Sequence, residues 1–267
     1  MPASDPDLVQ QFEHDTWSRC ADEYLDGFAG LTAPAVPLLV HAARIGAGDR
    51  VLEVGSGPGH IAAALAETGA DVAGIDFSAS MVEVAKSRYP TLSFREADAE
   101  SIPFDDESFD AVVSSFVVHH LARPETVFRE VHRVLKPGGR FAFAVFAAPE
   151  AQSSIGAFFG AVEAHGSPED LPHGPLFGVT DLGIYESMLR QAGLIDSAFS
   201  MEPTMWHAPS ADPVIRSFRN WGNMAALPAS VWERIESATR ESLKAYERDG
   251  ALAMPHEALV GSAVRPN

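Results

Sequence analysis

The stretch VLEVGSGPG, residues 51–59, gives the first indication of how this chain folds. Apolar residues on both sides of Glu53 predict a short buried strand, and three glycines predict a tight turn into an alanine-rich helix. Glycine lets the backbone close on a ligand, because it has no side chain to block the approach. The first N–H groups of a helix lack partners and lie at its positive dipole end, so this turn suits a carboxylate or a phosphate.

A second predicted strand ends at Asp76, where a carboxylate can accept hydrogen bonds from both hydroxyls of a ribose. The turn and this acid together favour a ligand that contains a nucleoside. The glycine spacing separates two classes of such ligands. The dinucleotide fingerprint is G-x-G-x-x-G, whereas this chain has Gly55, Gly57 and Gly59, with His60 where the third dinucleotide glycine would fall.

The motifs beyond this corner follow a characteristic order. They are FSASM at 77–81, ADAESIPF at 97–104, SFDAVVSS at 108–115 and RVLKPGGR at 133–140. Together with the E-x-G-x-G-x-G turn, this succession resembles the class I S-adenosylmethionine-dependent methyltransferases. Within that class it is similar to methyltransferase type 11, the group of the ubiquinone and menaquinone biosynthesis enzymes. The resemblance covers about residues 45–147.

The resemblance implies that S-adenosyl-L-methionine (SAM) is the cofactor and S-adenosyl-L-homocysteine its product. Asp76 is then expected on the ribose hydroxyls, Asp98 on the adenine amino group and Glu53 near the methionine ammonium group. Each acid could instead cap a helix or face solvent, and Phe77 and Met81 could pack in the core instead of around an adenine. The residues expected at the cofactor are Glu53, Gly55, Ser56, Gly57, Gly59, Asp76, Phe77, Met81, Asp98, Ala99 and Ser115.

Two adjacent histidines, His119 and His120, follow the predicted strand at 109–115. Relatives often have a histidine matching His120 near the transferred methyl group, so both are candidate catalytic bases. A histidine can take a proton from an acidic oxygen or carbon at neutral pH. The alternative is a polar residue satisfied by the backbone or by Glu130. An extended backbone would point the two side chains apart, and the sequence has no metal-binding motif.

Alternating strands and helices predict an α/β fold. We expect a Rossmann-like, doubly wound, mostly parallel seven-stranded sheet with an antiparallel last strand, plus helical cap segments. The predicted strands are 50–55, 71–76, 92–96, 109–115, 139–147, 194–201 and 251–264, and the predicted helices lie near 59–68, 78–88, 124–135 and 181–192.

Four segments are expected along the chain. They are an N-terminal helical lid at 1–45, a SAM-binding core at 46–202 with a loop insertion at 149–180, a helical substrate-cap insertion at 203–249, and a final strand and tail at 250–267. The loop insertion should contain one short helix around 153–164. Trp17 and Tyr24 resemble aromatic residues of relatives whose first helices cover the cofactor, although packing on a helix face would also explain them.

Composition excludes several classes of protein. The 267 residues are 46% hydrophobic, which is enough for a full core, and the formal net charge is −18. So acidic a chain has no electrostatic footprint for nucleic acid or an anionic membrane. No apolar run approaches the ~20 residues of a membrane span, the acidic N-terminus is unlike a signal peptide, and the single cysteine, Cys20, excludes an internal disulfide. We therefore expect a soluble, cytoplasmic monomer or homodimer.

The favoured function is methyl transfer from SAM to a small organic acceptor by in-line attack, on carbon or oxygen if a histidine serves as base. One alternative is a protein of the same fold that binds SAM without methyl transfer, as a cyclase, a decarboxylase or a binding module. A second alternative, an NAD-linked oxidoreductase, is disfavoured by the glycine spacing. The identity of the acceptor does not follow from the sequence.

Overall fold

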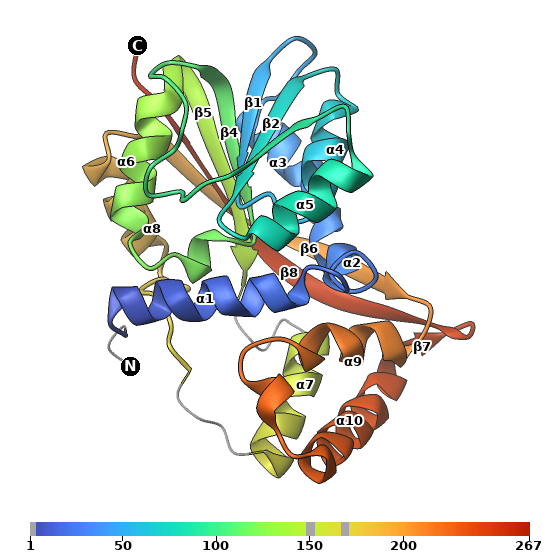
Figure 1. Ribbon diagram of the computed structural model, residues 1–267. Helices are drawn as coiled ribbons and strands as arrows, with labels where there is room; N and C mark the ends of the chain where they lie inside the picture. The colour runs from blue at the N-terminus through green and yellow to red at the C-terminus, as the bar shows by residue number, and fades with distance from the viewer. Residues whose placement is uncertain (1–3, 148–152, 167–170) are drawn as a thin grey trace.

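The computed structural model describes residues 4–147, 153–166 and 171–267 (Figure 1). The parts of the predicted lid and loop insertion at 1–3, 149–152 and 167–170 lie outside these described residues. Within them, one sheet runs in the order β3-β2-β1-β4-β5-β8-β6, and a short strand β7 pairs with β8. The strands are β1 (Arg50–Val54), β2 (Asp71–Asp76), β3 (Ser93–Glu96), β4 (Phe109–Ser115), β5 (Leu135–Phe146), β6 (Ile195–Ala208), β7 (Glu247–Arg248) and β8 (Ala251–Val264).

The first five strands of the sheet are parallel, whereas β8 runs antiparallel to both β5 and β6. The last strand is reversed because the chain enters it from helices beyond the carboxyl ends of the other strands, as Figure 1 shows. This topology confirms the predicted Rossmann-like α/β class, its seven-stranded path and its antiparallel last strand.

Helices cover both faces of the sheet (Figure 1): α3, α4 and α5 lie on one face, and α6 and α8 lie on the other. The predicted helices are confirmed nearly at their expected bounds, including the short helix in the loop insertion. The helices are α1 (Pro6–Cys20), α2 (Phe28–Thr32), α3 (Val36–Ala43), α4 (His60–Ala66), α5 (Ala79–Arg88), α6 (Pro124–Val134), α7 (Ser153–His165), α8 (Leu182–Gln191), α9 (Ala211–Arg219) and α10 (Ala229–Leu243). Short 3-10 turns lie at Ala33–Ala35, Val118–His120 (η2), Met224–Ala226 and Lys244–Tyr246.

Strand β5 illustrates why the core has two layers. Successive side chains of a strand point to opposite faces. Phe141 and Phe143 therefore join the apolar cluster beneath α6 and α8, while Ala142 and Ala144 join the cluster beneath α3 and α4. Both sets are buried, as expected for a central strand covered by helices on both faces.

Two strands are longer than predicted. Strand β5 begins at Leu135, which pairs with Phe109 ahead of an irregularity in the ladder. Strand β6 continues beyond the predicted 194–201 to Ala208, because it pairs with β8 as far as Leu252. The insertion expected to be helical from 203 therefore begins as strand, and its first helix, α9, starts at Ala211.

Helices α7, α9 and α10 pack on one another in a separate layer, which we call the cap. Its interior is aromatic and aliphatic, with the rings of Phe158 and Phe218 stacked 4.2 Å apart. Figure 1 shows α1 crossing the carboxyl ends of the parallel strands, between the sheet and the cap. Ligands of doubly wound sheets bind at this edge, so α1 and the cap surround the expected site.

Candidate active site

The glycine turn between β1 and α4 is shaped by three left-handed residues. Gly55, Gly57 and Gly59 have φ of 74°, 50° and 84°. A Cβ on Gly55 would lie 2.4 Å from a methyl carbon of Val117, and a Cβ on Gly59 would lie 2.7 Å from the Phe94 ring. A Cβ on Gly57 would have only the Met81 sulfur within reach, at 4.0 Å. The outer glycines are therefore required by packing, whereas Gly57 faces open space.

Asp76 stabilises this turn through hydrogen bonds to backbone N–H groups. Its Oδ2 accepts a hydrogen bond from the Gly57 N–H (2.8 Å), and its Oδ1 accepts one from the Ser78 N–H (2.9 Å). Burial raises the pKa of Asp76 to about 6, although these two hydrogen bonds oppose the shift. Ser78 in turn caps α5. Asp76 thus contacts the backbone at the start of α5, close to the capping role given as the alternative to ribose binding. Each of its carboxylate oxygens can still accept a further hydrogen bond.

A cavity with an empty volume of about 880 Å³ opens beside the turn, and we call it the corner cavity. Nine of the residues predicted for the site line it, whereas Glu53, Ser56 and Gly59 lie behind its wall and His119 lines a second cavity. The nine are Gly55, Gly57, Asp76, Phe77, Met81, Asp98, Ala99, Ser115 and His120. The structure therefore gathers residues far apart in the sequence around one cavity.

Several buried polar atoms, in or next to the turn or on residues that line the cavities, have no hydrogen-bond partner among the described residues. They are Glu53 Oε2, Ser56 Oγ, His60 Nδ1, Ser115 Oγ and His119 Nδ1. Burial raises the pKa of Glu53 well above its usual range, the nearby Asp76 adds to this, and the Ala62 backbone opposes it. An unsatisfied buried polar group is costly, so such a group near a cavity indicates a missing polar partner.

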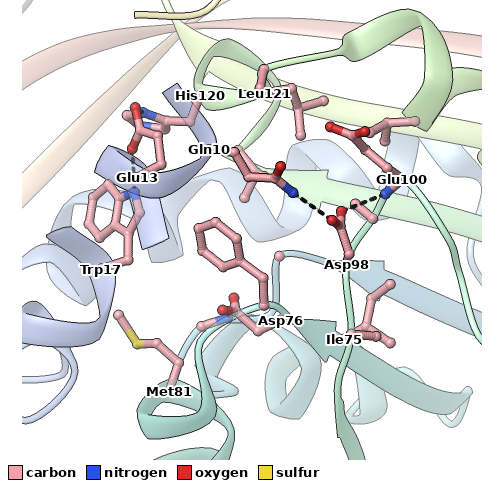
Figure 2. Close-up of a pocket in the computed structure, with 18 of the residues that line it drawn as sticks. Gln10, Glu13, Trp17, Ile75, Asp76, Met81, Asp98, Glu100, His120 and Leu121 are labelled. Carbon is pink, nitrogen blue, oxygen red and sulfur yellow. Dashed lines mark hydrogen bonds and ion pairs between the residues drawn. The ribbon is translucent and has the colours of Figure 1, made fainter. Parts of the chain in front are cut away.

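Helix α1 closes the corner cavity through polar contacts. The Gln10 amide donates to Asp98 Oδ2 (2.6 Å), and Asp98 Oδ1 accepts from the Glu100 N–H (2.8 Å), as Figure 2 shows. Arg123 contacts both Asp7 of α1 and Glu100. The Gln10 amide is a donor of the same kind as an adenine amino group, so it occupies the partner position predicted for adenine on Asp98.

A second cavity, which we call the aromatic cavity, has an empty volume of about 960 Å³. It shares Trp17, Tyr24, Phe116 and His120 with the corner cavity, so the two are neighbours. Its other aromatic walls are Phe28, His119, Phe146, Phe159, Phe177, Tyr185, Phe218 and Trp221. Among the described residues that line it, none is Asp, Glu, Lys or Arg, so it suits an uncharged, apolar compound.

His120 lies where the two cavities meet. Its Nδ1 is 3.0 Å from Oε1 of Glu13, a buried residue of α1, and the Trp17 ring meets its ring edge-on. The prediction of Glu130 as an alternative partner of the histidines is wrong, because the Glu130 carboxylate accepts hydrogen bonds from Arg133 and from the Ile102 N–H.

The two histidines do not point apart. They lie in the 3-10 turn η2, and a tight turn brings their rings to 4.0 Å, whereas an extended backbone would separate them. Burial, together with the neighbouring His120, lowers the pKa of His119 well below its usual range. His119 is therefore neutral at physiological pH and faces the aromatic cavity.

Glu13 and Gln10 both line the corner cavity but were not predicted from the sequence. The buried positions of α1 are Val9, Glu13, Thr16 and Cys20, which recur at helical spacing. Glu13 thus falls on the apolar face of the helix, and a carboxylate there needs a partner when the face is buried. That pattern was available in the sequence as a signal.

Within the described ranges, no three His, Cys, Asp or Glu side chains form a group able to hold a metal ion. A search of the same residues finds no helix with the length and hydropathy needed to cross a membrane.

Comparison with known proteins finds a match for the core of the chain. Residues 52–143, which contain the glycine turn, Asp76, Asp98 and both histidines, match the sequence model of a family described as methyltransferase domain. This part of the chain is therefore similar to a methyltransferase domain. The match ends within β5, so it includes neither α1 nor the cap.

Individual relatives give matches of similar, partial extent. A demethylmenaquinone methyltransferase of Clavibacter sepedonicus is 44% identical over 106 residues, which are 39% of this chain and 43% of that protein. The uncharacterised methyltransferase YcgJ of Bacillus subtilis is 35% identical over 139 residues, or 50% of this chain and 55% of that protein. The matched parts thus span about half the length of these relatives.

Solved structures share the fold over more of the chain. The crystal structure of YcgJ superposes with a TM-score of 0.58 at 24% identity, covering 87% of this chain and 98% of that one. A Haemonchus contortus phosphoethanolamine N-methyltransferase 2, solved in complex with SAM, has a TM-score of 0.60 at 21% identity and covers all of this chain and 61% of that one. The chain therefore shares its overall fold with these two proteins.

Proposed function

We propose that this protein binds SAM in the corner cavity and transfers its methyl group to a small, uncharged, largely apolar acceptor in the aromatic cavity. The observation that carries the proposal is the shared wall of the two cavities, where His120 and Trp17 belong to both. Methyl transfer needs two compounds held in contact and in line, and neighbouring cavities of different character meet that need.

The residues of the corner cavity fit SAM. Asp76 would accept the ribose hydroxyls, Asp98 the adenine amino group, and Phe77 would lie against the ring, while the open side of Gly57 admits the ligand to the backbone. Glu53 lies behind the turn with one unpartnered oxygen, so it would reach a methionine ammonium group through water. SAM supplies a methyl group on a positively charged sulfur, and the protein contributes alignment and exclusion of water.

The aromatic cavity supports a carbon or oxygen acceptor. Aromatic walls without charged side chains favour a flat, neutral molecule. If such a molecule is methylated on carbon or oxygen, it must lose a proton from that atom. His120 is the base that we assign to this step. Demethylmenaquinone, which names several relatives, is a first acceptor to test.

Calorimetric titration with SAM tests the cofactor half of the proposal. We expect binding to the unmodified protein and to Asp71→Asn, because Asp71 lies at the exposed opposite end of β2, and a large loss in Asp76→Asn. If millimolar SAM gives no heat with the unmodified protein, the proposal fails.

Labelled methyl transfer tests the acceptor half. The protein is incubated with methyl-labelled SAM and with neutral hydroxylated aromatics, and their carboxylated and amino-substituted analogues serve as matched controls. We expect label in the neutral compounds. An unlabelled, rearranged product, or SAM binding with no labelled product from any compound, would instead indicate the non-methylating alternative.

A further inference from the structure

We propose that Glu13 of α1 is a positioning residue that sets the tautomer of His120, so that Nδ1 carries the hydrogen and Nε2 is the atom that takes a proton. The tautomer follows from the contacts alone. Its use in catalysis rests on the proposed function, because His120 acts as a base only if an acceptor is methylated.

The contacts leave Glu13 little freedom. Its Oε1 lies 3.0 Å from His120 Nδ1, and its Oε2 accepts a hydrogen bond from the Trp17 indole N–H (2.9 Å). Figure 2 shows the Glu13 side chain between these two partners. A carboxylate only accepts hydrogen bonds, so Nδ1 must donate, and neutral imidazole then has its lone pair on Nε2. An acid that orients a catalytic histidine in this way also stabilises the imidazolium that forms.

Glu13 is the acid that contacts His120 among the described residues. His119 is the other titratable group against this ring, and it lies on the same turn. The remaining rings in contact, from Trp17 and Phe177, are uncharged. The acids that share the corner cavity are engaged elsewhere: Asp76 by backbone N–H groups, Asp98 by Gln10 and Glu100 by Arg123.

The Trp17 indole N–H determines how the side chain of a Glu13→Gln variant is oriented, so this variant tests the tautomer of His120. The indole N–H is a donor only, so it selects the amide oxygen of the new glutamine and turns the amide NH₂ toward His120. Nδ1 must then accept, and the hydrogen moves to Nε2. The variant keeps the shape of the side chain and both hydrogen bonds but places the proton on the wrong nitrogen.

Nitrogen-15 NMR of the imidazole reads the tautomer directly, in the unmodified protein and in Glu13→Gln. We expect Nδ1–H in the former and Nε2–H in the latter. We also expect kcat for the neutral acceptor to fall about 100-fold, the range for loss of a general base, while KM changes less than about threefold. Asp15→Asn is the matched control, because it removes one carboxylate from an exposed position of the same helix and should change neither readout.

A double variant separates positioning from simple damage to the structure. Adding Trp17→Phe to Glu13→Gln removes the donor that fixes the amide, so the amide can turn its oxygen to Nδ1–H. We expect the Nδ1–H signal to return and kcat to recover at least about tenfold relative to Glu13→Gln, with Trp17→Phe alone as the reference. A tautomer that is the same with and without Glu13, or a kcat unaffected by its change, overturns the proposal. If no acceptor is ever methylated, the NMR comparison still decides the tautomer, so the two proposals fail separately.

Discussion

The corner cavity and the aromatic cavity share a wall, yet they are built in different ways. The corner cavity takes its polar groups from Gly57, Asp76 and Asp98, which follow neighbouring parallel strands and are held by backbone hydrogen bonds. The aromatic cavity takes its walls from elements far apart in the chain, among them α1, β5, α7 and the segment after α9, and these walls are mostly apolar and aromatic side chains. One cavity depends on turn geometry and the other on packing, so changes in one should leave the other intact.

The largest expected effect is on SAM binding, from a change of Asp76 in the wall of the corner cavity. We expect Asp76→Asn to weaken SAM binding about 100-fold, since hydrogen bonds to a charged acceptor contribute about 1.5–3 kcal/mol. Titration calorimetry measures the loss, and Asp71→Asn should bind SAM like the unmodified protein. A matching loss of acceptor binding in Asp76→Asn would contradict the independence of the cavities.

Removing an aromatic side chain from the aromatic cavity should affect acceptor binding and not SAM binding. Phe159 lines the aromatic cavity, whereas its neighbour Phe158 is fully buried in the cap. We expect Phe159→Ala to raise the acceptor KM about 10-fold, from the apolar contact that is lost, and to leave the SAM dissociation constant within about twofold. Steady-state kinetics measures the first and calorimetry the second.

Phe158→Ala is the control for this comparison. Removing a fully buried phenylalanine should lower the free energy of unfolding by about 3–5 kcal/mol, measured by denaturant titration, with less effect on KM than Phe159→Ala. Equal KM values for the two variants would mean that packing of the cap, and not contact with the acceptor, determines KM.

The pH dependence of SAM binding should also reflect the corner cavity. Because the pKa of Asp76 is raised to about 6 in the free protein, lowering the pH from 7 to 5 protonates the carboxylate that we expect to bind ribose. SAM affinity should therefore fall as the pH drops through about 6, reaching roughly a 10-fold loss at pH 5. Calorimetry across this range gives the profile, and a profile of the same shape in Asp76→Asn would exclude Asp76 as its origin.

The smallest expected effect concerns Gln10, whose amide holds Asp98 in the free protein. An adenine amino group would have to displace it. We expect Gln10→Ala to strengthen SAM binding by about threefold, the scale of one net hydrogen bond. If calorimetry shows weaker binding instead, Gln10 contacts the cofactor and does not compete with it.

The residues predictable from sequence are those placed by local backbone geometry. The turn at Gly55–Gly59 and the acid at Asp76 could be located because a strand, a turn and a helix succeed one another at short spacing. Their contacts, such as Asp76 with the Gly57 N–H, follow from neighbouring parallel strands. The alternation of strands and helices predicted the parallel strands, whereas the reversed last strand was expected from the fold that the motifs resemble.

The rest depends on contacts across long stretches of chain. Glu13 and His120 are separated by 107 residues, and nothing local to either one identifies the other. Strand β6 was predicted to end at 201, but its pairing with β8 continues through Pro203 to Ala208. Proline is tolerated in such a strand, since β6 lies at the edge of the sheet.

Helix α1 borders both cavities, with Gln10 on Asp98, Glu13 on His120 and Trp17 in both walls. In the proposed reaction, spent cofactor and methylated product therefore leave past the same helix. In that reaction an outward movement of α1 would free both compounds, and its rate would set an upper limit on turnover. The ion pairs of Arg123 with Asp7 of α1 and with Glu100 would oppose this movement.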